Sequence, residues 1–162
     1  MASVTRLPSE EIPDDLRAPA VFGDLVCAFT APIRPQPKER PRVTRRGGAY
    51  TPSRTRDFEN AIAWAATAAM KGRPATGEPV RLVVLAEQVD RRQADLDNIV
   101  KAVADGLSSH RSSKNHAGRI GPVIRNDAQV VEIRARLVRG ADRDAVTVLV
   151  EELHPTPAKE KP

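Results

Sequence analysis

Apolar residues that alternate with polar ones predict four main strands in this chain. Residues 25–31 (LVCAFTA) form a short apolar run, and residues 79–89 place apolar side chains at every second position. Residues 129–138 alternate most clearly, and a turn at residues 139–144 leads into the apolar run 145–153. Because only a short turn separates the last two strands, we expect them to pair as a β-hairpin.

Two other stretches repeat their apolar residues at the spacing of a helix face. Residues 51–72 carry Phe58, Ile62 and several alanines at this spacing, and Gly72 is suited to end the helix. In residues 95–107 the apolar side chains form one stripe, Leu96, Ile99, Val100, Val103 and Leu107. The order of elements predicts an α/β domain of the α+β type, with one mixed sheet and two main helices.

The length of 162 residues suits one domain. We expect a loosely held N-terminal segment at residues 1–20, the domain at residues 21–153 and a disordered tail at residues 154–162. Residues 108–122 form a long polar loop, which in a compact domain often carries function. No apolar run approaches the ~20 residues of a membrane span, so we expect a cytoplasmic protein with no membrane partner. Cys27 is the single cysteine, which excludes a disulfide within the chain and favours a buried thiol.

Positive charge is concentrated in two segments, although the whole chain carries only +5. Residues 34–56 hold eight Lys and Arg against one acid, and residues 110–125 hold four basic residues and no acid. Two such segments on an otherwise acidic chain indicate a polyanionic partner. Charge alone leaves a pair of solvated loops as an equal alternative.

The stretch ADLDNIVKAVADGL contains charged side chains opposite its apolar stripe. Asp95 and Asp97 can converge if Asp95 is still extended and the helix begins directly after it. Carboxylates of this kind are ligands for Mg²⁺, and Asp127, at the start of the clearest strand, is the third candidate ligand. Lys101 cannot bind a cation, but it can stabilise charge on a phosphate oxygen.

Other interpretations of these acids remain open. Asp97 would cap the helix and pair with Lys101 four residues later, which stabilises a helix by only a few tenths of a kcal/mol. Asp105, two turns along the helix, is a weaker candidate for the third ligand. A phosphatase-like Asp-x-Asp is disfavoured, because that motif ends an apolar strand and the polar VDRRQ precedes it here.

DLDNIVKAVADGL followed by NDAQVVEI resembles the RusA family of Holliday junction resolvases. The family pattern begins with Asp-x-Asp-Asn, has a Lys four residues after the second Asp, and continues with a block Asp-Asp-x-Gln-Val. The upstream stretch PKERPRVTRRGGAYTPSRTRDFEN is similar to the family's Pro-Lys-x-Arg-Pro-Arg region. The resemblance spans roughly residues 25–152, and the two blocks in this order are a specific signal.

The resemblance implies a homodimeric endodeoxyribonuclease that acts on four-way DNA junctions, in a bacterial cell or a phage-infected host. It places the metal ligands at Asp95, Asp97 and Asp127 and a catalytic lysine at Lys101. Mg²⁺ is the implied cofactor, with Mn²⁺ as the alternative. A two-fold dimer would present two sites to strands of opposite polarity. The expected contacts to the DNA backbone are Lys38, Arg40, Arg42, Arg45, Arg46, Arg134 and Arg136.

This chain departs from the family pattern in two places. Asn126 stands where the family has the first acid of its Asp-Asp pair, so we expect retained activity with weaker metal binding. The loop at residues 108–122 is longer than the family pattern suggests. Two rival functions remain open: a basic DNA-binding module without catalysis, and a Mg²⁺-dependent nuclease that acts on flaps, forks or plain duplex.

Overall fold

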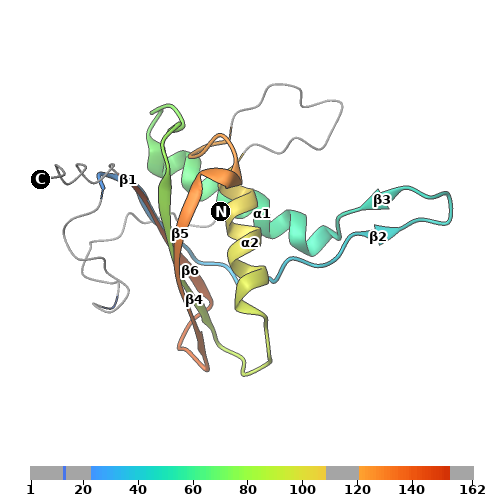
Figure 1. Cartoon of the computed structure of the whole chain (residues 1–162). Coiled ribbons are helices and arrows are strands. Elements are labelled where there is room, and N and C mark those ends of the chain that lie inside the picture. The colour runs from blue at the N-terminus through green and yellow to red at the C-terminus, as the bar shows by residue number, and fades with distance from the viewer. Residues whose placement is uncertain (1–12, 14–22, 109–120, 154–162) are drawn as a thin grey trace, which may run out of the picture.

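A mixed sheet of four strands carries two helices on one of its faces (Figure 1). In spatial order the strands are β1 (Leu25–Ala31), β6 (Ala145–Glu152), β4 (Val80–Gln88) and β5 (Val130–Arg139). The helices are α1 (Ser53–Met70) and α2 (Leu96–Leu107), and a short 3₁₀ turn, η3 (Asp127–Gln129), precedes β5. The strands β2 (Arg42–Val43) and β3 (Ala49–Tyr50) form a hairpin that projects away from the rest of the molecule (Figure 1).

The computed structural model describes Pro13 and residues 23–108 and 121–153. The predicted N-terminal segment except Pro13, the predicted tail, and most of the predicted loop at residues 108–122 lie outside the described residues. Each predicted helix and main strand is confirmed to within two residues at both ends, and the α+β fold class is confirmed. No helix among the described residues has both the length and the apolar character that crossing a membrane requires.

The predicted β-hairpin of the last two strands is wrong. β5 pairs in parallel with β4, whereas β6 pairs antiparallel with both β4 and β1. β4, α2 and β5 therefore form a unit in which the helix provides the crossover that parallel strands require. β6 is buried at five of its eight positions and β5 at none, so the more apolar strand takes the central place in the sheet.

The hairpin of β2 and β3 was not predicted as such. Four prolines before it exclude a helix, and the turn depends on local polar contacts. The Thr44 and Gly48 backbones pair across the turn, and the Gly48 N–H also donates to the Thr44 hydroxyl. Gly47 has a φ of 80°, in the left-handed region that glycine adopts without strain.

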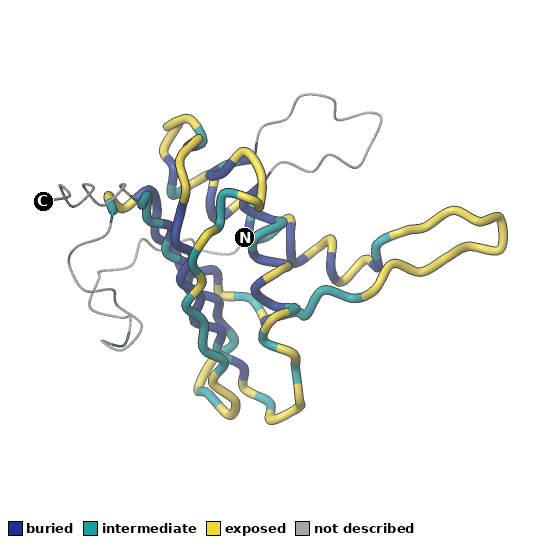
Figure 2. Tube along the Cα trace, in the orientation of Figure 1, coloured by how far each residue is buried: buried dark blue, intermediate teal, exposed yellow. Residues whose placement is uncertain are grey.

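The core fills the space between the helices and the sheet (dark blue in Figure 2). The predicted stripe of α2 is buried there, with Leu96 partly buried at its start. The two helices approach closely at Gly106, where an added Cβ would lie 2.8 Å from the Glu59 carbonyl oxygen and 2.9 Å from Ile62. Glycine at this position therefore allows the end of α2 to pack closely against α1.

An ion network fastens β5 to the sheet on the face away from the helices. The fully buried Arg81 of β4 lies 3.1 Å from Glu132 of β5 and 3.0 Å from Glu151 of β6. Desolvation alone would raise the pKa of Glu132, but hydrogen bonds and positive charge from Arg81 and Arg134 hold this pKa below its usual value. The network therefore helps to fix the position of an edge strand in which no residue is fully buried.

Candidate active site

Asp95 and Asp97, called the acidic pair below, flank the point where extended chain becomes helix. Asp95 has extended backbone angles (φ −82°, ψ 115°) and α2 begins at the next residue, which confirms the predicted geometry. The Asp95 side chain makes no capping hydrogen bond, and the Asn98 amide donates to it at 3.4 Å. Both carboxylates are exposed, so they are available to a ligand from solvent.

The interpretation of Asp97 as a helix cap that pairs with Lys101 is wrong. Asp97 lies inside the first turn of α2 rather than at the cap position. No ion pair joins it to Lys101 in the part of the chain that the structure describes, and both side chains are exposed. These two charges therefore do not stabilise the helix by pairing with each other.

Lys38, predicted to contact DNA, lies within the fold. Its ammonium group pairs with the carboxylate of Asp105 and lies 3.8 Å from Oε1 of Glu59 on α1. Its backbone N–H donates to the Asn98 carbonyl of α2 at 3.0 Å. Lys38 thus holds the proline-rich segment at residues 32–41 against both α1 and α2. Asp105, the weaker candidate for a metal ligand, is occupied by this ion pair.

Asp127 is presented by a turn that Asn126 and Gln129 close from both sides. The Asn126 side-chain oxygen accepts from the Ala128 N–H at 2.9 Å, and the Gln129 side chain accepts from the Asn126 N–H at 3.1 Å. This is a capping box, in which two side chains satisfy each other's backbone groups. Asn126 therefore has a structural role that its amide fills, while Asp127 remains exposed.

Gln129 also ties this turn to the loop before β4. Its side-chain nitrogen donates to the carbonyl oxygens of Thr76 at 3.1 Å and Glu78 at 2.9 Å. Its side-chain oxygen accepts a second bond, from the Arg125 N–H at 2.7 Å. Sequence reasoning missed this role, although an Asn followed three residues later by Gln is a recognisable capping signal.

Asp127 and the acidic pair lie at opposite ends of α2 (Figure 1). Ile124 donates its N–H to the carbonyl of Leu107 at the end of α2, whereas Arg139, at the far end of β5, donates to the Ala94 carbonyl beside the acidic pair. Twelve helical residues span ~18 Å. Among the described residues, no three His, Cys, Asp or Glu side chains lie close enough to hold a metal ion.

The prediction that three carboxylates meet within one chain is therefore wrong. The reason is the direction of β5, which runs parallel to β4 and so begins at the opposite end of the sheet from the end of β4. Asp127 stands at the beginning of β5, and the acidic pair follows the end of β4. A single chain brings together two of the three predicted ligands.

A model of the family Endodeoxyribonuclease RusA matches residues 32–151. This chain belongs to the RusA endodeoxyribonuclease family. The match contains both acidic blocks and the proline-rich basic segment, so the resemblance seen in the sequence is confirmed. No curated protein matches the chain. Membership of the RusA family favours a nuclease over a DNA-binding module without catalysis.

In this RusA family member the predicted DNA contacts other than Lys38 fall on two separate surfaces. Four lie exposed on or beside the projecting hairpin, Arg40, Arg42, Arg45 and Arg46. Arg134 and Arg136 lie partly buried on β5, on the sheet face away from the helices, and Arg134 donates to Glu132 at 3.0 Å. The hairpin is therefore the more accessible of the two surfaces.

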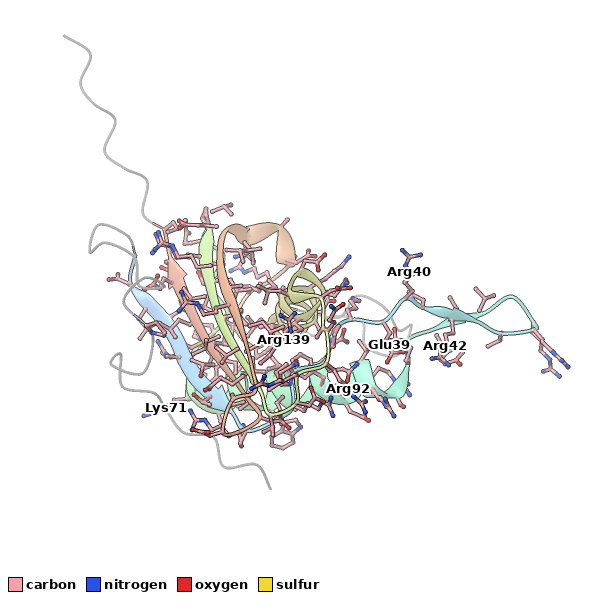
Figure 3. The ribbon with its side chains drawn as sticks, turned by 90° about the horizontal axis from the view of Figure 1, so that it is seen from below. Glu39, Arg40, Arg42, Lys71, Arg92 and Arg139 are labelled. Atoms are coloured by element: carbon pink, nitrogen blue, oxygen red, sulfur yellow. The ribbon has the colours of Figure 1, made fainter. Side chains whose placement is uncertain are left out.

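Two further arginines of this RusA family member lie near the acidic pair and were not predicted. Arg92 is exposed in the loop before α2, and Arg139 donates to the Ala94 carbonyl at 3.3 Å. Figure 3 labels both, viewed from the end of the molecule at which α2 begins. Arg139 reaches this place only because β5 ends there, so no local sequence pattern identifies it.

Proposed function

We propose that this chain is a Mg²⁺-dependent, homodimeric endonuclease that resolves four-way DNA junctions, in recombination, repair or the processing of phage DNA. The observation that carries the proposal is the separation of Asp127 from the acidic pair, at the two ends of an edge strand with exposed apolar residues. One chain then holds two different parts of an active site. A two-fold dimer would combine these parts into two complete sites.

β5 has the character of a strand that pairs with a second chain. Among the described strands it pairs only with β4, and its other edge is open. Val131 and Ile133 are 61% and 54% exposed, although their alternating pattern is that of a core strand. Exposed apolar residues along an open edge favour strand pairing between chains. We therefore assign the dimer contact to β5.

The register of such a pair would bring the separated acids together. In an antiparallel pair with its two-fold axis near Ile133, position 127 of one chain lies opposite position 139 of the other, because 133 is midway between them. Arg139 contacts the Ala94 carbonyl directly before Asp95. Each site would then contain the acidic pair of one chain and the partner's Asp127.

Such a site has the ligands that Mg²⁺ prefers, because all three side chains are carboxylates and all three are exposed. The ion would supply charge neutralisation and an activated water for in-line hydrolysis of a phosphodiester. The Asn98 amide orients the Asp95 carboxylate. Lys101 lies one turn from Asp97 with no ion pair among the described residues, so its ammonium group can offset charge on the phosphate as the bond breaks.

Mixing of inactive variants tests the shared site. Asp97→Asn and Asp127→Asn should each abolish cleavage of a labelled four-way junction in Mg²⁺ while leaving junction binding intact. In their heterodimer one site carries both substitutions and the other carries neither. Nicking should therefore return in the mixture, in about half of the dimers after random exchange of subunits.

The matched control mixes Asp97→Asn with Asp95→Asn. Both substitutions affect the same part of the site, so every site in this heterodimer is defective and the mixture should stay inactive. If the first mixture also stays inactive after exchange has been demonstrated, the shared site is wrong. If the protein cleaves junction, fork, flap and linear substrates equally well, its function is instead that of a Mg²⁺-dependent nuclease with broader substrate selectivity.

A further inference from the structure

A pocket of about 400 Å³ opens between the base of the hairpin and the start of α1. Its lining residues are Glu39, Arg42, Tyr50, Pro52, Ser53 and Arg54. Pockets of this size accept one small ligand rather than a macromolecular groove contact. None of the catalytic roles assigned above uses this pocket.

The pairing of β2 with β3 places the aromatic ring of Tyr50 beside the charged side chain of Arg42 in the pocket. Arg42 and Tyr50 are cross-strand partners in the hairpin, so their side chains share one face. Glu39 lies 3.5 Å from Arg42, and Figure 3 shows both on one side of the chain while Arg40 points to the other side. The Glu39 N–H donates to the buried Thr55 hydroxyl at 3.2 Å, which fixes the base of the pocket to α1.

The lining chemistry matches a nucleotide better than a simple anion. Arg42 and Arg54 supply guanidinium groups for a phosphate. Tyr50 is 48% exposed and offers a ring face on which a base can stack. The carboxylate of Glu39 would repel a lone phosphate, but it can accept a hydrogen bond from a base amino group.

The base of the pocket adjoins a residue whose backbone contacts the first turn of α2. Glu39 follows Lys38, whose N–H donates to the Asn98 carbonyl at 3.0 Å, and Asn98 follows Asp97. A nucleotide in the pocket would therefore hold a neighbouring phosphate close to the start of α2. When the four arms of a junction open, the stack ends at the branch point, so a nucleotide there loses fewer stacking contacts on leaving the helix.

We infer that this pocket binds one unstacked nucleotide of the DNA at the branch point, beside the phosphate to be cut. The inference rests on the proposed junction-resolving function. It gives Tyr50 and Arg54 roles in the recognition of branched DNA, separate from the backbone contacts of the hairpin tip.

The test uses the Asp97→Asn chain, which binds without cutting, and a junction with 2-aminopurine at the branch point. Binding should change the fluorescence of the probe in the parent and in Tyr50→Phe, which keeps the ring. Tyr50→Ala should remove this change and weaken junction binding roughly five- to tenfold, with duplex binding unaltered. Val43→Ala, which alters another exposed apolar residue of the hairpin outside the pocket, should behave as the parent.

An abasic site at the branch point gives the complementary measurement. It should weaken binding by the parent but produce no further loss in Tyr50→Ala. If Tyr50→Ala binds the junction and perturbs the probe as the parent does, the inference is wrong while the proposed function stands. If the parent itself fails to prefer the junction over duplex, both are wrong.

Discussion

At the scale of single residues, Asn126 and Gln129 show how side chains without catalytic chemistry hold an acid in position. Asn126 caps the turn that presents Asp127. The Gln129 side chain makes four hydrogen bonds, two to the N–H groups of Arg125 and Asn126 and two to the loop before β4. The structure therefore explains why an amide is tolerated at position 126. Whether it also weakens metal binding stays a prediction.

Gln129→Ala should reduce turnover more than it reduces junction binding, because Asp127 would lose the turn that orients it. Loss of the four bonds should also lower the free energy of unfolding by about 1–3 kcal/mol. Cleavage rates under saturating DNA and chemical denaturation measure the two effects. Gln129→Glu keeps the accepted bonds and loses the donated ones, so it should be intermediate in both assays; turnover equal to the parent in Gln129→Ala would contradict the assigned role.

Cys27 makes the stability of the fold depend on pH. Burial raises the pKa of its thiol from 9.0 to about 12, and the nearby positive charge of Arg73 opposes this rise only in part. The folded state therefore keeps a proton that the unfolded chain releases. Stability from this group is complete below pH 9.0 and falls as pH rises from 9.0 towards 12, by at most about 1.4 kcal/mol per pH unit.

Cys27→Ala should remove this part of the pH dependence. Denaturant unfolding between about pH 8 and about pH 11 should show a shallower loss of stability in the variant than in the parent. The difference between the two chains isolates the thiol from Lys and Tyr residues that titrate in the same range. Parallel pH profiles would show that the thiolate forms without a folding penalty.

At the scale of elements, the proline-rich segment at residues 32–41 contacts both α1 and α2 and so links the two helices. Lys38 provides a positive charge next to Glu59, whose side chain is 7% exposed, and next to Asp105 on the other helix. The segment also carries Glu39 at the base of the nucleotide pocket. The Lys38 ammonium group therefore adds to the backbone hydrogen bonds from Lys38 and Glu39 that hold this segment against the two helices.

Lys38→Met should destabilise the fold by about 1–3 kcal/mol, because it removes the cation beside two partly or fully buried carboxylates. Thermal or denaturant unfolding measures this change. Adding Glu59→Gln to the Lys38→Met chain should recover part of the loss, since the buried negative charge is then absent. A double variant less stable than the single one would show that the pairing of Lys38 with Glu59 is unimportant.

At this scale the sequence predicted the features that depend on neighbouring residues, but not those that depend on contacts between distant segments. The boundaries of α2 and the extended geometry of Asp95 follow from an apolar stripe and local backbone rules, and both predictions are confirmed. The pairing of β5 with β4 depends on which strand is buried on both faces, a comparison between distant segments. The short turn between β5 and β6 looks the same whether or not the strands pair.

Contacts between distant segments also determine which predicted site residues lie close together. Asp127 was expected beside the acidic pair because both motifs carry acids, but the sequence does not show the direction of β5 relative to β4. Lys38 was expected on the surface because it lies in a basic segment, and its partner Asp105 is distant in the chain. Composition identified the basic surface, whereas contacts between distant residues decided which cations are exposed on it.

At the scale of the whole molecule, the basic hairpin lies apart from the compact body (Figure 1). Its arginines are exposed, which suits contacts to a DNA backbone without base readout. Such contacts release counterions, so their number is measurable from the salt dependence of binding.

Arg45→Ala combined with Arg46→Ala should reduce the slope of log affinity against log salt by up to about 2. Binding to junction and duplex should weaken together, because neither residue lies in the nucleotide pocket. Lys71→Gln is the matched control, since Lys71 is an exposed cation at the far end of α1 from the hairpin (Figure 3). Because the control removes one charge and the variant removes two, a fall in the control of about half that in the variant would mean that overall charge, not the hairpin, attracts the DNA.

The place of β6 in the sheet has a consequence for synthesis of the protein. Of the strands that the structure describes, β6 leaves the ribosome after the other three strands of its sheet, yet it lies between β1 and β4 and hydrogen-bonds to both. A nascent or prematurely terminated chain that lacks residues 145–152 leaves two apolar strands without their shared neighbour. Such fragments would expose surface that proteases and chaperones recognise, so DNA-cutting capacity would arise only when translation of the domain is nearly complete.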